Sequence, residues 1–97
     1  MTLGNNLELL KEAYKLLLEG DEILKEYFDY EVDIKDRFVD EENEIIIIKD
    51  NLGKYIQYDV YDCYTALIKV SKLYSNIKLH KVCKRLKEIS IEAEMIH

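Results

Sequence analysis

The 97-residue chain contains no proline and no tryptophan, and it has only three glycines and two cysteines. The scarcity of proline and glycine, with 48% hydrophobic and 35% charged residues, argues against a disordered or linker-rich chain. A chain of this length is typical of one domain, so we expect a single domain over residues 1–97 with a thin core.

Long hydrophobic runs are also missing. No apolar stretch approaches the ~20 residues that a membrane-spanning helix needs. The first ten residues, MTLGNNLELL, lack the basic and then apolar order of a signal peptide. These absences predict a cytoplasmic protein with no membrane partner. In that compartment Cys63 and Cys83 are expected to be reduced and buried.

Charge is distributed unevenly along the chain. Residues 1–62 carry seven Lys and Arg against seventeen Asp and Glu, a balance of −10. Residues 63–97 carry seven against three, a balance of +4, and together these give the net charge of −6. The acidic part suits a basic partner, and the basic part either balances it within the fold or suits a phosphate.

Apolar spacing predicts three helices. The first runs to Phe28, and its apolar stripe stays in phase across Gly20, which favours one continuous helix kinked at the glycine. The alternative is that the helix ends at Gly20 and that Asp21 caps a short second piece. A second helix is capped by Asp59 or Asp62, and a third follows the break at Ser75 and Asn76.

Period-two alternation in FDYEVDIK (28–35) predicts a strand with one solvated face. The segment DRFVDEEN (36–43) is expected to be a polar connection, with Phe38 and Val39 anchored beneath it.

A hairpin is the clearest local prediction. Four isoleucines precede the turn DNLG (50–53), which matches a type I turn with a left-handed glycine. Pairing Lys49 with Lys54 divides the hairpin residues between two faces. The predicted core face carries Ile45, Ile47, Ile56 and Tyr58, and the opposite face carries Ile46, Ile48, Tyr55 and Gln57.

These elements predict a small α+β domain of order α-β-β-β-α-α, in which a three-stranded antiparallel meander packs on helices. The alternative is a helical bundle with a projecting β-hairpin.

No catalytic motif is recognisable in the sequence. There is no glycine-rich phosphate loop, and no serine lies in a glycine elbow. His80 and Cys83 form a single pair of potential metal ligands, whereas structural zinc needs four. We therefore expect neither an enzyme nor a cofactor or metal site.

The function predicted from these features is that of a small acidic protein-interaction module, an inhibitor or regulator. It would dock a basic protein, including one that itself binds nucleic acid, with carboxylates in place of phosphates. Tyrosine and isoleucine would supply the dry centre of the contact. The predicted partner-binding residues are Ile46, Ile48, Tyr55, Gln57, Asp59, Glu31, Asp33, Glu41 and Glu42.

Two other interpretations remain open from the sequence. A nucleic-acid-binding regulator would use the basic third helix, through Lys78, Lys81, Lys84, Arg85 and Lys87. A homodimer would pair the exposed hairpin faces across a two-fold axis.

Overall fold

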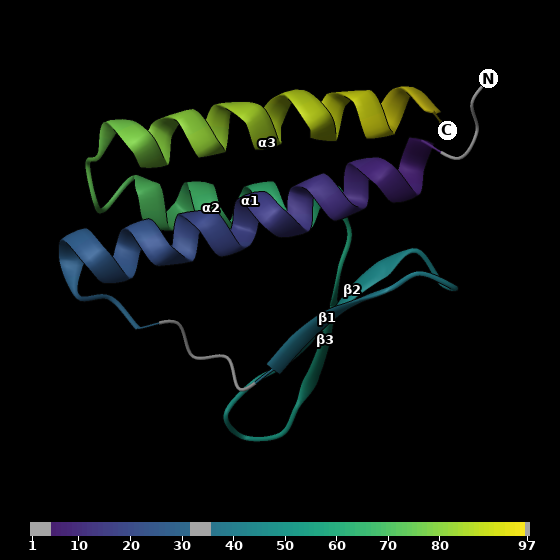
Figure 1. Ribbon diagram of the computed structural model, residues 1–97, viewed down its shortest axis with the longest axis horizontal. Coiled ribbons are helices and arrows are strands. Elements are labelled where there is room, and N and C mark those ends of the chain that lie inside the picture. The colour runs from purple at the N-terminus through teal and green to yellow at the C-terminus, as the bar shows by residue number, and fades with distance from the viewer. Residues whose placement is uncertain (1–4, 32–35, 97) are drawn as a thin grey trace.

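The computed structural model describes residues 5–31 and 36–96. Its elements are α1 (Asn5–Phe28), β1 (Asp36–Asp40), β2 (Ile45–Lys49), β3 (Tyr55–Tyr58), α2 (Val60–Ser71) and α3 (Ile77–Ile96). The strands form an antiparallel sheet in the order β1-β2-β3, and the helices lie together on one side of it (Figure 1). The predicted α+β class and element order are confirmed.

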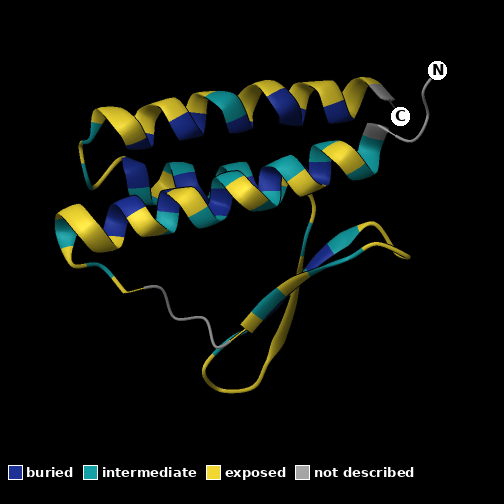
Figure 2. Ribbon diagram, viewed as in Figure 1, coloured by how far each residue is buried: buried dark blue, intermediate teal, exposed yellow. Residues whose placement is uncertain are grey.

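The helices supply most of the core. In Figure 1, α1 and α2 run in one general direction and α3 returns in the other. The fully buried large side chains on these helices are Leu10, Leu24, Leu79, Leu86 and Ile89. Figure 2 shows buried positions recurring along each helix, with exposed positions between them. This is the pattern of amphipathic helices that share one core.

Both cysteines lie in this core as free thiols, in agreement with the prediction. Burial raises the pKa of the Cys63 thiol to about 12. A thiol with so high a pKa is almost entirely protonated at neutral pH, and only the thiolate is strongly nucleophilic. Cys63 is therefore a packing residue.

The N-terminus of α2 is fixed by a reciprocal cap. The Asp62 N–H donates to the Asp59 carboxylate over 2.8 Å, and the Asp59 N–H donates to the Asp62 carboxylate over 3.0 Å. Both predicted capping residues thus contribute, and the strand β3 passes into α2 with one intervening residue.

Gly20 of α1 lies directly against the side chain of Leu67 of α2. A Cβ at position 20 would lie 2.6 Å from Cδ2 of Leu67, too close for a carbon contact. The continuous helix predicted through Gly20 is confirmed, and the glycine is explained by this close approach.

Gly20→Ala is expected to lower the free energy of unfolding by about 1 kcal/mol. Alanine gains ~1 kcal/mol of helix propensity, but overpacking a core typically costs ~1–3 kcal/mol. Chemical denaturation of this variant and of Glu19→Ala, an exposed neighbour in α1, provides the comparison. Equal or greater stability of Gly20→Ala would contradict this account of the glycine.

The β2–β3 turn explains why the predicted register is wrong by one residue. The Gly53 N–H donates to the Asp50 carbonyl, and Gly53 has φ +84°. The Asp50 N–H in turn donates to the Lys54 carbonyl, so these two residues close the turn. A type I turn followed by a left-handed glycine adds one residue before the returning strand, and Lys49 therefore pairs with Tyr55.

This shift exchanges the two faces of β2, whereas the faces of β3 stay as predicted. Ile46 and Ile48 are buried against the helices with 0% and 2% exposure, so their predicted exposure is wrong. Ile45 and Ile47, assigned to the core from the sequence, lie half-buried on the opposite face. On the buried face, Tyr58 packs against the core as predicted, whereas Ile56 at the sheet edge is 40% exposed.

The first strand is also displaced from its predicted position. Helix α1 continues to Phe28, and Asp29 follows with φ +54°. Residues 32–35 of the predicted strand lie outside the described residues, and the strand observed is β1, in the segment predicted to be a polar connection. Within β1, Val39 packs against the core, but Phe38 is 49% exposed and is not an anchor.

Candidate functional site

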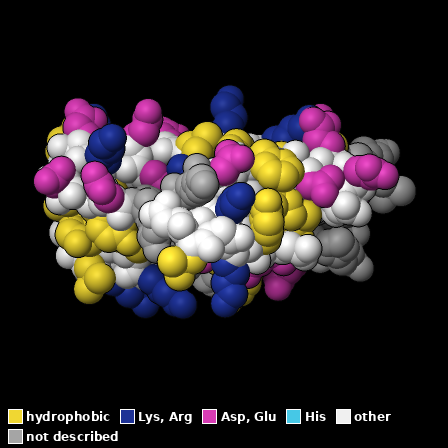
Figure 3. Space-filling model, turned by 90° about the horizontal axis from the view of Figure 1, so that it is seen from below, with side chains coloured by type: hydrophobic (Ala, Val, Ile, Leu, Met, Phe, Trp, Pro, Cys, Tyr) yellow, Lys and Arg dark blue, Asp and Glu magenta, His cyan; other side chains and the backbone are white. Residues whose placement is uncertain are grey.

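One face of the sheet points away from the helices. The register aligns Phe38, Ile47 and Gln57 in one row across the three strands, and Asp36, Lys49 and Tyr55 in the next. We define the outer sheet face as Phe38, Ile45, Ile47, Tyr55 and Gln57. Its aromatic side chains are well exposed, with 49% for Phe38 and 64% for Tyr55. Figure 3, seen from the side of the sheet, shows hydrophobic side chains gathered beside charged ones.

The outer sheet face differs in composition from the face predicted from the sequence. Tyr55 and Gln57 are exposed, as predicted, but Ile46 and Ile48 are replaced by Ile47 and Phe38. Phe38 was missed as a candidate because its segment was interpreted as a connection. Phe38 and Val39 are adjacent apolar residues, so no period-two alternation marked this segment as a strand.

Acidic residues cluster in the β1–β2 turn. The Asp40 carboxylate accepts from the Asn43 N–H and from its Nδ2, which holds the turn together and keeps the pKa of Asp40 below its ordinary value. Glu41 and Glu42 project from this turn and are exposed, and Glu41 forms an ion pair with Lys11 over 3.3 Å. The carboxylates therefore lie at one end of the sheet.

The other predicted acidic residues lie elsewhere. Asp59 is exposed, but its carboxylate caps α2. Glu31 is exposed beyond the end of α1, and Asp33 lies outside the described residues. Tyr55 is four strand residues from the acidic turn, or roughly 13 Å at ~3.3 Å per residue. The structure thus places the acidic turn and Tyr55 at opposite ends of one sheet, with Phe38 in the row between them.

The basic helix proposed for nucleic acid is α3. The lysines at positions 78, 81, 84 and 87 are exposed. The Arg85 guanidinium already donates two hydrogen bonds to Glu12, over 2.6 and 3.0 Å, and a single one to Glu88 over 3.3 Å. The hydrogen bonds from Arg85 hold the pKa of Glu12 below its ordinary value. Any phosphate contact on α3 would therefore rest on the lysines.

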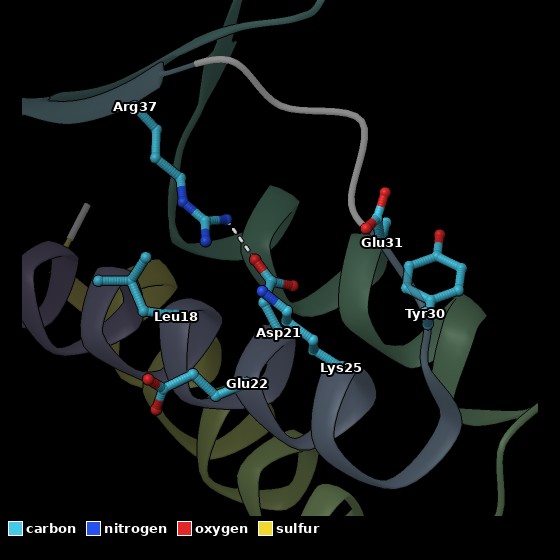
Figure 4. Close-up of a pocket in the computed structure, with 7 residues that line it drawn as sticks. All are labelled: Leu18, Asp21, Glu22, Lys25, Tyr30, Glu31 and Arg37. Carbon is cyan, nitrogen blue, oxygen red and sulfur yellow. Dashed lines mark ion pairs between the residues drawn. The ribbon is translucent and has the colours of Figure 1, made fainter.

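A buried ion pair was not predicted. Arg37 on β1 and Asp21 on α1 point toward one another, and the NH1 atom of Arg37 contacts the Oδ2 atom of Asp21 (Figure 4). Their side chains are only 16% and 14% exposed. Burial raises the pKa of Asp21, and the charge of Arg37 opposes that rise. The sequence signal was an aspartate on the apolar stripe of α1, but nothing there identified its partner.

The pair lines two spaces. A surface hollow of about 480 Å³ is lined by residues of α1 and by Tyr30, Glu31 and Arg37. A smaller space of about 180 Å³ lies between α1, α2 and the sheet; it is partly open to the surface, and we call it the interior cavity. Asp21, Tyr30 and Arg37 line both spaces.

Within the part of the chain that the structure describes, no three His, Cys, Asp or Glu side chains come together as metal ligands. None of the described helices is both long and apolar enough to cross a membrane. The chain matches no protein-family model, and no curated protein or solved structure shows significant similarity to it.

Proposed function

We propose that this protein is a small acidic, non-enzymatic interaction module that inhibits or regulates a basic protein by docking on it. The outer sheet face provides the apolar contact, and the acidic turn at residues 41–44 provides charge complementarity. The observation that carries the proposal is the exposure of Phe38 and Tyr55 on one sheet face with no helix of the described chain over it.

The chemistry of this face suits a protein partner. Tyrosine and phenylalanine bury large areas at low entropic cost, and aromatic side chains are enriched at interfaces. Lys49 lies 5.5 Å from the ring centroid of Tyr55, which orients this ring at the sheet surface. A single ring of this kind at the centre of a contact often carries much of the binding energy.

Charge favours a basic partner. The chain has a net charge of −6, and exposed carboxylates of Asp36, Glu41 and Glu42 flank the outer sheet face. Such a field accelerates association with a basic surface and disfavours acidic ones. This surface therefore suits a basic protein as its partner, including one whose groove otherwise binds phosphates.

Tyr55→Ala is expected to weaken capture of the basic partner by about 30-fold, corresponding to ~2 kcal/mol for the loss of an exposed aromatic side chain from the contact. The measurement is affinity capture from the native host, followed by titration of the retained protein with each variant. Tyr27→Ala, which removes an exposed tyrosine from α1, is the matched control and should bind like the wild type.

The basic helix supplies the contrasting variant. If Lys81→Glu with Lys84→Glu abolishes capture while Tyr55→Ala does not, the proposed docking face is wrong. Duplex or single-stranded DNA retarded in a gel at low salt, with binding that weakens steeply as salt rises, would instead identify α3 as a nucleic-acid interface. A mass of twice the monomer in light scattering, lost on Tyr55→Ala, would show that the occupant of the face is a second copy.

A further inference from the structure

The interior cavity is unusual because a charged pair lines a largely apolar space. Its walls include Leu17, Leu24, Ile48 and Leu67, together with the ion pair. Its volume of about 180 Å³ is close to that of the ~150 Å³ apolar cavities that accommodate one benzene molecule. The space is therefore large enough for one aromatic ring or a short branched chain.

Two atoms of the ion pair have unused bonding capacity. Asp21 Oδ2 and Arg37 NH1 are both buried, and among the described residues neither finds a hydrogen-bond partner besides their mutual contact. A carboxylate oxygen accepts more than one hydrogen bond, and a guanidinium nitrogen carries more than one donor. Buried charged groups are normally satisfied by additional partners, because each unmet bond costs free energy. A further polar group next to this pair would stabilise it.

The charges around the pair restrict what that group can be. An anion would lie beside the carboxylates of Asp21, Glu22 and Glu31, and a cation would lie beside Arg37 and Lys25. Either one would also lose its hydration without a counter-charge of its own, since the ion pair is already neutral. A hydroxyl group avoids both costs, because it donates to a carboxylate and accepts from a guanidinium.

We infer that the interior cavity is a binding site for a small neutral alcohol or phenol, whose hydroxyl lies on the Asp21–Arg37 pair and whose apolar body lies among the core side chains. The surface hollow shown in Figure 4 adjoins this site, because Asp21, Tyr30 and Arg37 line both spaces. This inference is independent of the outer sheet face and of any protein partner.

The test is an NMR titration of amide resonances in the full chain with benzyl alcohol, toluene and benzoate. Benzyl alcohol should give saturable shifts at Asp21, Ile48 and residues 66–70, and should bind about tenfold tighter than toluene, because its hydroxyl adds a hydrogen bond to a charged group. Benzoate should give no saturable shift. Ala66→Leu, which fills the cavity from α2, should abolish binding, whereas Lys69→Leu, on the exposed side of that helix, should preserve it.

The polar part of the site has its own variant. Asp21→Leu combined with Arg37→Met replaces the pair by apolar side chains of similar size and should bind toluene and benzyl alcohol equally. The inference is overturned if benzyl alcohol shows no saturable shift, in which case water alone occupies the space. It is also overturned if toluene or benzoate binds the wild type as tightly, or if Ala66→Leu leaves binding unchanged.

Discussion

Arg37→Met is expected to lower the free energy of unfolding by about 3 kcal/mol, because it leaves the buried Asp21 carboxylate without a counter-charge. The pair joins β1 to α1, so its loss weakens the attachment of the sheet to the helices. The Arg37 backbone also takes part in this attachment, since the Tyr14 hydroxyl donates to the Arg37 carbonyl over 2.9 Å. That bond is retained in the variant, which isolates the contribution of the guanidinium. Urea denaturation measures the difference.

The double variant Asp21→Leu with Arg37→Met separates the cost of an unpaired charge from the value of the pair itself. Replacing a buried ion pair by apolar groups of similar volume is often neutral or stabilising by ~1–4 kcal/mol. We expect the double variant to be at least as stable as the wild type, although one of its two substitutions is destabilising alone. A double variant as unstable as Arg37→Met would show that the methionine, and not the orphaned carboxylate, is responsible.

The loss in Arg37→Met should depend on pH. Burial raises the folded-state pKa of Asp21, so the folded protein binds the Asp21 proton more tightly than the unfolded chain does. The resulting stabilisation is fully present below the unfolded pKa and is lost as pH rises through the folded pKa. Arg37 opposes that rise, and its removal raises the pKa of Asp21 further. The stability difference between wild type and variant should therefore be small in acid, where Asp21 is neutral in both, and grow toward neutral pH. A difference that is constant with pH would contradict this linkage.

The order of elements could be predicted because each depends on local information. Helical stripes, the DNLG turn and the aspartates before α2 all act within a few residues. The strand β1 was misplaced because FDYEVDIK (28–35) alternates with period two, whereas DRFVD (36–40) has Phe38 and Val39 side by side and lacks that pattern. The tertiary contacts of Val39 with the core and of Arg37 with α1 decide the position of β1.

The candidate site was only partly predictable, for a specific reason. A strand's two faces exchange when its register changes by one residue, so a small error in the turn exchanged the buried and exposed isoleucines of β2. Four consecutive isoleucines gave no internal guide to the correct face, because both faces of β2 are apolar. Tyr55 and Gln57 remained exposed in either register because β3 lies at the sheet edge. The buried pair could not be predicted because Asp21 and Arg37 are sixteen residues apart in sequence, and only the fold brings them together.

Those same isoleucines provide the strongest test of the register. Ile46→Ala is expected to lower the free energy of unfolding by about 4 kcal/mol, because Ile46 is 0% exposed and its truncation leaves a cavity in the core. Ile47→Ala, its matched control in the same strand, should cost about 1 kcal/mol, because Ile47 is only half-buried on the outer sheet face. Both variants lose the same side-chain atoms and the same strand propensity, so their difference reports burial alone. The sequence-based register requires the opposite order. If chemical denaturation finds Ile47→Ala the less stable of the two, the sequence-based register is correct. Ile46 and Ile48 would then lie at the surface, and the proposed docking face would include them.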